Sequence, residues 1–364
     1  MRKLFVALLI LSVMGGAFAQ VSVGGGAEAS VVLAGGGDDI KGSGSIDLAR
    51  IALSGENDAG TFGGYVRADF SGAIGGIGVD IDNDGTDDFT MPEGLTTKAH
   101  AWWKPIDQLK IIIGQPGDGV WGKDGVTGWG FTGPAKQVAI EGYGYNAFFG
   151  GTGGGTNQLH FEIKPIDLLG INIALPYFAG GKVEDIFKGI TAQVDVNLDF
   201  GNIALSYQGN SGNATNGDLY LFVGLNVISN VDLHFSGHFV LPGDVKDQQI
   251  GAGLGAEITI SDAFGLKARL NAEFGGKPEG KLGLLFDILP YFTVSDSLKV
   301  FANLGISVNQ ADKNADAVIG YIVNPYIQID GGGPAFWAGF QLSGTTASGS
   351  KAKWAIPIGI TFGF

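Results

Sequence analysis

Long segments in which apolar and polar residues alternate constrain the fold of this chain more than any other feature. In ITAQVDVNLDF, at positions 190–200, every second residue from Ile190 to Phe200 is apolar, and the residues between them are polar. The alternation recurs in DLYLFVGLNV (218–227) and GLKARLNAEF (265–274), and it extends over most of the chain. Successive side chains of a β-strand point to opposite faces. These segments are therefore predicted to be strands with one apolar and one polar face.

The composition supports an all-β chain. Glycine contributes 64 of 364 residues, well above the average of about 7%, and hydrophobic residues make up 45%. This hydrophobic content is too high for a disordered chain. Glycine does not recur at every third position, as collagen would require. Cysteine is absent, so the fold must form without disulfide bonds.

The length and spacing of the segments distinguish a membrane barrel from a soluble sandwich. Each alternating segment spans about 9–11 residues, the length of a tilted strand that crosses a membrane. Ordinary strands average about 5–6 residues. Short turns and longer polar loops alternate between the segments, as they do in outer-membrane barrels. We therefore predict an all-β fold, a single transmembrane antiparallel β-barrel formed by residues 20–364.

The connections between the segments predict the number of strands. Eight short turns are expected at 54–59, 105–108, 165–168, 200–201, 229–230, 261–264, 295–297 and 330–334. Nine longer loops are expected at 34–43, 72–95, 116–156, 176–189, 209–217, 240–248, 275–280, 308–318 and 344–352. These connections separate eighteen strands, with the segment 137–149 assigned to the longest loop. Merging one weak hairpin would leave about 16 strands, which is also an even number, as bacterial barrels require.

The N-terminal segment MRKLFVALLILSVMGGAFA has the three parts of a secretory signal peptide. Two basic residues precede an apolar run from Leu4 to Val13, and small residues lead to the sequence Ala-Phe-Ala that ends at Ala19. The run is shorter than the roughly 20 residues that a membrane-spanning helix needs. We expect cleavage after Ala19, so that residues 1–19 are not part of the barrel. Removing the two basic residues changes the formal net charge from −14 to −16.

The chain closes with KWAIPIGITFGF, residues 353–364, a complete alternating strand that ends in an aromatic residue. This ending resembles the C-terminal signature of Gram-negative outer-membrane proteins. The mature chain resembles porin-like β-barrels, and the general character of its sequence is similar to that of spirochaete members. The resemblance implies a bacterial outer-membrane protein surrounded by lipid, and the trimeric state that porins often adopt. It also implies that the outer-membrane assembly machinery reads Phe364, Phe362 and Ile360. Pro357 departs from the signature because proline lacks a strand-pairing N–H, and we expect a bulge there.

The polar faces of the predicted strands would line the interior of the barrel. Acidic residues outnumber basic residues on these faces, and rings of charge set the ion preference of pores. A barrel of about 16–18 strands is wide enough to leave an aqueous channel. The sequence therefore predicts a porin, a passive and mildly cation-preferring diffusion channel for small hydrophilic solutes or ions. The alternative is a structural or adhesive surface protein with a closed lumen. The predicted pore-lining residues are Arg67, Asp69, Asp195, Asp199, Asp232, His234, His238, Lys267, Arg269 and Glu273.

The histidines do not indicate an enzyme. His234, Ser236 and His238 share one face of the segment VDLHFSGHFV with Asp232. Neighbours on one face of a strand are separated by two rises of about 3.4 Å, which is too far for a catalytic relay without partners on adjacent strands. We interpret these residues as polar pore lining and expect no catalytic residue and no required cofactor. An acidic chain also gives no support for a nucleic-acid partner.

The loop segment DIDNDGTDDF contains an incomplete calcium-binding pattern. Its acidic residues occupy positions 1, 3, 5 and 9 of a calcium loop, with a glycine at position 6. Position 12, which is normally a bidentate Glu, is Met91, and no predicted helix flanks the loop. A weak Ca²⁺ site within 80–91 and a solvated acidic turn both remain open. The candidate ligands are Asp80, Asp82, Asp84, Thr86 and Asp88.

The longest predicted loop contains a glycine-rich segment, PGDGVWGKDGVTGWGFTGPA, at 116–135. It resembles the loop that folds inward and narrows the channel of many porins. By that resemblance, the constriction would be formed by Trp121, Lys123, Asp124 and Trp129. A surface loop with aromatic anchors is the alternative.

Removal of Phe364, or the substitution Phe364→Asp, is expected to leave export intact and to stop insertion into the outer membrane. The assembly machinery would no longer recognise the final strand. Membrane fractionation with a test for heat-modifiable mobility would detect the loss, and Lys353→Ala, at the other end of the same segment, is the control. Normal insertion of the Phe364 variants would contradict the assignment.

Overall fold

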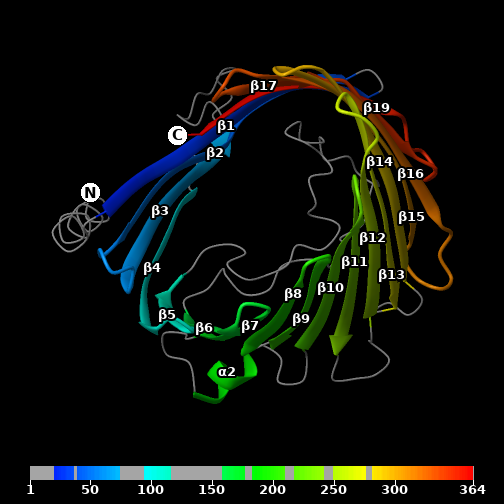
Figure 1. Ribbon diagram of the computed structural model, residues 1–364. Coiled ribbons are helices and arrows are strands. Elements are labelled where there is room, and N and C mark those ends of the chain that lie inside the picture. Colours follow the sequence, from blue (N-terminus) through cyan, green and yellow to red (C-terminus); the bar gives the residue numbers. More distant parts are fainter. Residues whose placement is uncertain are drawn as a thin grey trace, which may run out of the picture.

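The computed structural model describes residues 20–36, 39–73, 94–115, 158–176, 183–209, 217–241, 249–275 and 281–363. Within them, one antiparallel sheet closes on itself as a barrel (Figure 1). Consecutive strands pair along the chain, and β1 (Gln20–Gly36) also pairs with β19 (Lys353–Gly363). Closure through the two ends of the chain satisfies the backbone groups of strands that would otherwise form sheet edges. Residues 1–19 and Phe364 lie outside the described residues.

The described residues contain nineteen strand segments, two of which are parts of one strand. β17 (Ala335–Gly339) and β18 (Gln341–Thr345) both pair with β16 on one side and β19 on the other. Counting them as one strand leaves eighteen, which confirms the predicted number. The other bounds are β2 (Asp39–Glu56), β3 (Phe62–Ala73), β4 (Gly94–Ile106), β5 (Leu109–Gly114), β6 (Gln158–Ile166), β7 (Leu169–Pro176), β8 (Thr191–Leu198), β9 (Gly201–Gly209), β10 (Gly217–Ile228), β11 (Val231–Leu241), β12 (Gln249–Thr259), β13 (Phe264–Gly275), β14 (Leu282–Ser295), β15 (Leu298–Gln310) and β16 (Val318–Asp330).

Two prolines explain the interruption between β17 and β18. The registers on either side of Phe340 place it opposite Pro325 of β16 and Ile356 of β19, and they place its neighbour Gly339 opposite Pro357 of β19. Proline has no N–H to donate to a ladder, so pairing weakens at Phe340 on the side of β16 and at Gly339 on the side of β19. The Phe340 N–H still bonds to the Pro325 carbonyl oxygen at 2.9 Å. The pairing of β1 with β19 continues without a shift at Pro357, so the expected bulge in β19 is wrong and the irregularity falls on the neighbouring strand.

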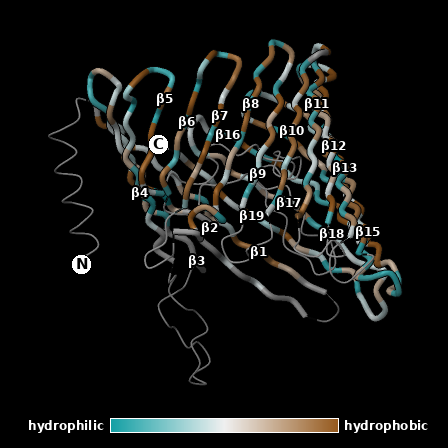
Figure 2. Tube along the Cα trace, turned by 90° about the horizontal axis from the view of Figure 1, so that it is seen from below, coloured by the Kyte–Doolittle hydropathy of each residue, from teal (hydrophilic) through white to brown (hydrophobic). Residues whose placement is uncertain are grey.

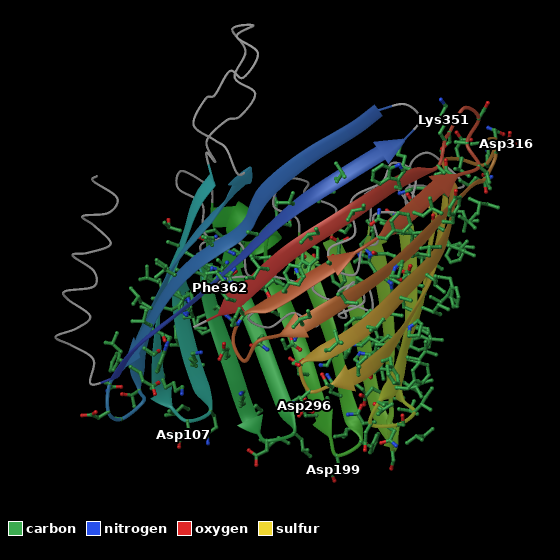
Figure 3. All side chains as sticks on the ribbon, turned by 90° about the horizontal axis from the view of Figure 1, so that it is seen from above. Asp107, Asp199, Asp296, Asp316, Lys351 and Phe362 are labelled. Atoms are coloured by element: carbon green, nitrogen blue, oxygen red, sulfur yellow. The ribbon has the colours of Figure 1, made fainter. Side chains whose placement is uncertain are left out.

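The eight predicted short turns all separate consecutive strands. Five of them contain only two residues between strands: 107–108, 167–168, 199–200, 229–230 and 296–297. Figure 3 places three of these turns, at Asp107, Asp199 and Asp296, together at one end of the barrel. Asp316 and Lys351, in the connections after β15 and β18, lie at the other end (Figure 3). The two ends are called the short-turn end and the loop end.

The repeated sequence Lys-Pro-Ile-Asp forms the same hairpin twice. In each copy the isoleucine before the turn pairs with the leucine after it, Ile106 with Leu109 and Ile166 with Leu169. In each copy the register shifts by one residue where the Lys-Pro pair enters the ladder. Proline explains the shift because it cannot donate a ladder hydrogen bond. The repeated sequence is therefore also a structural repeat.

Two predicted loops differ from the structure. The expected loop 34–43 is wrong because strand pairing continues to Gly36 opposite Asp39. The expected loop 176–189 contains a short helix, α2 (Val183–Lys188), which the alternation of the strands gave no reason to expect. In the described part of the chain, no helix is both long enough and apolar enough to span a membrane.

The barrel is apolar outside and polar inside, and Figure 2 shows the two characters alternating along the strands. In β19 the side chains of Ile356, Ile358 and Ile360 are 38%, 41% and 43% exposed. The residues between them are buried. This arrangement is the reverse of a soluble protein, in which large aliphatic side chains are among the most buried. It is the arrangement expected of a barrel that faces lipid.

Strand lengths differ around the barrel. β1 and β2 contain 17 and 18 residues, whereas β5 contains 6 and β8 contains 8. Gln115 follows β5, Ile190 precedes β8, and neither of them belongs to a strand. The side of the barrel formed by β5 to β8 is called the low wall.

Candidate functional site on the inner wall

The interior-facing side chains, called the inner wall, are mostly polar. Among the described residues, 20 polar or charged residues are buried, against nine hydrophobic ones. Polar groups removed from bulk water are stable only when hydrogen bonds or charge partners compensate them. The fully buried polar side chains include Gln158, His160, Gln193, His238, Asn271, Glu273, Asp287, Asn303, Ser307, Asn324, Gln341 and Ser343.

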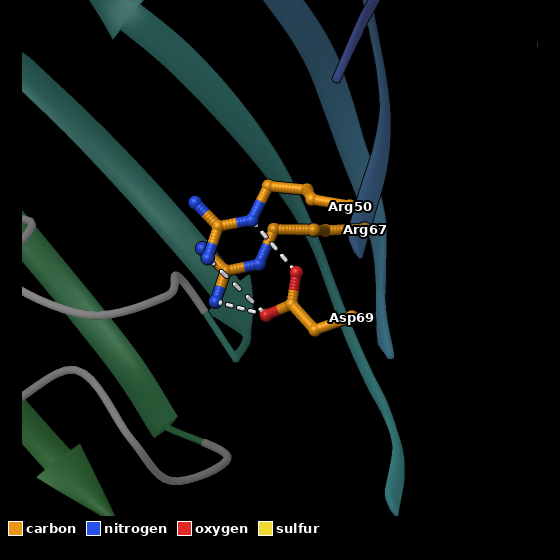
Figure 4. Close-up of polar contacts among 3 residues, drawn as sticks. All are labelled: Arg50, Arg67 and Asp69. Carbon is orange, nitrogen blue, oxygen red and sulfur yellow. Dashed lines mark hydrogen bonds and ion pairs between the residues drawn. The ribbon is translucent and has the colours of Figure 1, made fainter. Parts of the chain in front are cut away.

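Two arginines hold one aspartate on the wall formed by β2 to β4 (Figure 4). Arg50 Nε donates to Asp69 Oδ1 at 2.7 Å, and Arg67 Nη2 lies 2.6 Å from Asp69 Oδ2. The strand register produces this contact, because Arg50 stands directly opposite Asp69 and Arg67 precedes it by two residues on the same face. Lys98, which is buried, stands opposite Arg67 on β4. This group therefore contains more basic than acidic side chains.

Directly opposite residues form further ion pairs across neighbouring strands. Arg269 and Asp287 stand opposite each other on β13 and β14, with Arg269 Nη2 2.7 Å from Asp287 Oδ2. The exposed fractions of their side chains are 9% and 0%. Two similar contacts are Lys267 Nζ to Glu257 Oε2 at 3.2 Å and Lys110 Nζ to Glu162 Oε2 at 3.4 Å.

Glu273 binds donors from two neighbouring elements at the loop end of β13. Lys281 Nζ donates to Glu273 Oε1 at 2.9 Å, and the Gln249 amide donates to the same oxygen. The ion pairs together neutralise most of the charge that the sequence places on the inner wall.

A polar network on the low wall connects β6 to β9. His160 Nε2 lies 3.3 Å from Asn172 Oδ1, and Asn172 Nδ2 donates to Asp195 Oδ2 at 3.4 Å. Gln193 Nε2 donates to the same carboxylate oxygen at 2.7 Å, and Ser206 Oγ donates to Gln193 Oε1 at 3.1 Å. The network therefore holds a carboxylate by amide donors and not by a basic side chain.

Histidines on β4 and β11 pack against aromatic rings of neighbouring strands. His238 lies parallel to Tyr220, with ring centroids 4.5 Å apart, and its Nε2 is 3.4 Å from Asp218 Oδ1. His234 meets the Phe222 ring edge-on at 5.5 Å, and His100 stacks on Tyr65 at 5.2 Å. These contacts form ordinary cross-strand pairs of the kind that stabilise sheets.

An aromatic and amide patch covers the inner wall near the short-turn end of β14 to β17. Phe301 stacks on Tyr326, with ring centroids 4.7 Å apart, and Trp337 packs in the same buried cluster. Asn303 stands opposite Asn324 beside these rings, and both are fully buried. Their amide atoms form no hydrogen bond within the described part of the chain.

Nine of the ten predicted pore-lining residues lie in strands, on the polar face of each, and Asp199 does not. Asp199 lies in the exposed two-residue turn between β8 and β9. Its assignment as pore lining is wrong because β8 ends at Leu198, and the alternation of faces holds only along extended backbone.

Sequence reasoning missed Arg50 and Asp287. The apolar residues of β2 switch from even positions at Ile46 to odd positions at Ile51, and the register shifts between these points. That switch of phase was the available signal that Arg50 shares a face with Asp69. Asp287 is the single charged residue in the run LGLLFDILPYF. The strand register identifies its partner, Arg269, which stands directly opposite it.

Several predicted sites lie outside the described residues. They are the calcium candidates Asp80, Asp82, Asp84, Thr86 and Asp88, the constriction residues Trp121, Lys123, Asp124 and Trp129, and the terminal Phe364. Phe362 and Ile360 lie in β19 with their side chains exposed on the outer face.

No protein-family model and no curated protein matches the sequence. OccK1 (OpdK) of Pseudomonas aeruginosa aligns with a TM-score of 0.61 at 8% identity, over 96% of this chain and 100% of that chain. A triple mutant of Rhodopseudomonas blastica porin aligns with a TM-score of 0.50 at 15% identity, over 95% and 100% of the two chains. A loop-deletion mutant of OmpT, an outer membrane protein of Vibrio cholerae, aligns with a TM-score of 0.51 at 14% identity, over 95% and 99%.

At such low sequence identities, these structural alignments establish the fold and nothing finer. The chain is a closed eighteen-stranded β-barrel of the porin type, with a polar and charged inner wall.

Breaking the buried pair of Arg269 and Asp287 is expected to destabilise the barrel. Arg269→Ala should lower the free energy of unfolding by about 3–5 kcal/mol, because Asp287 keeps a buried charge without this partner. The double variant Arg269→Met, Asp287→Leu should recover most of the loss, since no buried charge remains. Guanidinium unfolding of the protein in lipid vesicles measures both effects. Equal stability of the single and the double variant would contradict the pairing.

Proposed function

We propose that this protein is a porin of a bacterial outer membrane, a passive diffusion channel for small hydrophilic solutes or ions. The observation that carries the proposal is a closed barrel of eighteen strands with a polar inner wall and an apolar exterior. Barrels of about 16–18 strands are wide enough to leave an aqueous channel, whereas barrels of about eight strands are filled by their own side chains. Solutes would then cross along the inner wall without contacting lipid.

We propose a mild preference for cations. The chain contains 36 acidic and 22 basic residues. On the inner wall, Asp195, Asp218 and Asp232 have no Lys or Arg partner among the described residues. Exposed aspartates at the short-turn end add negative potential at that mouth, which raises the local concentration of cations. The basic group around Asp69 opposes this effect, and the preference is therefore mild.

We propose that the barrel has no catalytic role. Ser236, between His234 and His238, is buried, and its Oγ forms no hydrogen bond within the described part of the chain. A serine nucleophile is activated by a hydrogen bond to a general base. His238 instead lies against Tyr220 and Asp218.

The purified protein, refolded into a planar lipid bilayer, is expected to give stepwise ion conductance. Under a KCl gradient, the reversal potential should correspond to a cation-to-anion permeability ratio above one, because carboxylates without a Lys or Arg partner favour cations. Protein that has not refolded, identified by its gel mobility, is the control. A silent bilayer with correctly folded protein would contradict the channel and favour the surface-protein alternative. A ratio below one would contradict only the cation preference.

We further propose that copies of the chain associate through the low wall, in trimers as in many porins. The six residues of β5 span about 15 Å along the membrane normal, from a rise of about 3.3 Å per residue and a tilt of about 40°. The apolar band of an outer-membrane barrel is about 25 Å tall. Contact between low walls would cover with protein the part of the apolar band that the short strand β5 does not span. The outward side chain of Ile113 is 56% exposed there.

Single-cysteine variants test the oligomer directly, because the chain contains no cysteine. Ile113→Cys on the low wall is expected to cross-link between copies in membranes treated with a bifunctional maleimide. Phe286→Cys, on the outer face of the long strand β14, is the matched control and should stay monomeric on denaturing gels. Cross-linking of Phe286→Cys alone would contradict the low-wall contact.

A further inference from the structure

Arg50 is the most accessible member of the basic group that it forms with Arg67 and Lys98 on β2 to β4. The side chain of Arg50 is 34% exposed, whereas that of Arg67 is 9% exposed and Lys98 is buried. Arg50 Nε donates to Asp69 Oδ1 at 2.7 Å, and Arg50 Nη2 donates to Asp69 Oδ2 at 3.4 Å (Figure 4). Arg50 is therefore a charged side chain of the inner wall that a solute in the lumen can reach.

The contacts with Asp69 use only part of the hydrogen-bonding capacity of Arg50. A guanidinium group carries five N–H groups, one on Nε and two on each terminal nitrogen. Asp69 accepts the N–H of Nε and one N–H of Nη2, which leaves both N–H groups of Nη1 and the second one of Nη2. In the described part of the chain, Asp69 is the only polar partner of the Arg50 side chain. The remaining donors, called the Arg50 fork, can therefore receive a ligand.

Asp69 holds the fork in a fixed orientation. Its carboxylate contacts Arg50 through Oδ1 and Arg67 Nη2 through Oδ2, the latter at 2.6 Å, so that one acid holds two guanidinium groups. These three side chains together carry more positive than negative charge. Because the fork is already oriented, less conformational entropy is lost when a ligand binds to it.

The side of Arg50 that faces β1 is formed by glycines. Gly26 stands directly opposite Arg50, and Gly363 of β19 stands opposite Gly26 on its other side. Gly24 is the preceding inward residue of β1. These three glycines, called the glycine shelf, place no side chain beside the guanidinium and leave room for a ligand. Glu28, the next inward residue of β1, is acidic, so an anion is expected on the side of Gly24.

We propose that the Arg50 fork and the glycine shelf bind the carboxylate or phosphate group of a small anionic solute as it passes through the lumen. The inference rests on the proposed channel function, because the lumen supplies the solute. A guanidinium fork matches the paired oxygens of a carboxylate or a phosphate, and such charge-assisted hydrogen bonds are about twice as strong as neutral ones. The site adds a class of bound solute to the channel. The carboxylates of β8 to β11 that have no Lys or Arg partner still favour cations among simple ions.

Block of the single-channel current tests the site. Potassium gluconate and potassium phosphate, added separately to channels that conduct KCl, are expected to reduce the current until the block saturates. Sorbitol, an uncharged molecule of nearly the same size as gluconate, should not give a saturable block. Arg50→Gln is expected to raise the half-blocking concentration roughly fivefold or more, because the charge-assisted contacts are lost. Block by gluconate alone would assign the site to carboxylates, and block by phosphate alone would assign it to phosphates.

Two further variants separate a binding site from the effect of charge alone. Lys299→Gln removes one positive charge from β15, outside the basic group, and should leave the half-blocking concentration unchanged. Arg50→Lys retains the charge but lacks the planar fork. It should keep the reversal potential near the wild-type value and still raise the half-blocking concentration. Heat-modifiable gel mobility confirms that each variant is folded.

A wild-type channel that conducts KCl but is blocked by neither anion would overturn the site. Equal effects of Arg50→Gln and Lys299→Gln would overturn it as well, because they would show that only the field of the wall matters. An unchanged half-blocking concentration in Arg50→Lys would contradict the role of the fork. Absence of conductance in the wild type would instead contradict the proposed channel. Calorimetric titration of the folded wild type and of Arg50→Gln with gluconate and phosphate would then still decide whether Arg50 binds an anion.

Discussion

The closed ladder of backbone hydrogen bonds is the constraint on which the rest of this structure depends. A strand that faces lipid has no water to satisfy its N–H and C=O groups, so each strand must pair on both sides. Pairing of β1 with β19 completes the ring. The same requirement explains the interrupted strand at Gly339 and Phe340, which stand opposite Pro357 and Pro325: pairing is lost there locally, and the ring stays closed on both sides.

Closure also decides how the inner wall carries charge. Antiparallel pairing brings directly opposite residues close together, so a basic residue on one strand meets an acid on the next, as Arg269 meets Asp287 and Lys267 meets Glu257. Four acidic and four basic residues of the wall are neutralised in this way. Asp195 has no basic residue directly opposite it, because the register places Gly170 and Ala204 there. The selectivity of the proposed channel would then depend on the few carboxylates that the register leaves without a basic neighbour.

Much of the fold could be predicted because the barrel is built from local rules. Alternation, turn residues and strand length are properties of short segments, and they predicted the eight short turns and the strand number correctly. The predictions were wrong where a strand ends or where its apolar and polar positions exchange. Asp199 lies one residue beyond the end of β8, and Arg50 follows a register shift that moved it to the face of Asp69. The helix α2 lies in a connection with no strand periodicity to read.

Within each regular stretch of strand, the sequence by itself determined which residues face each side of the barrel, because a period of two allows only one assignment once one face is apolar. It did not determine which residues meet. Partners such as Asp69 with two arginines, or Asp195 with none, depend on the register between strands that are separated along the chain. The difference in height between the low wall and the long strands β1 and β2 likewise emerges only when the ring is complete. Neighbouring strands bond through a backbone that is identical at every residue, so closure of the barrel decides the register and the side-chain contacts follow from it.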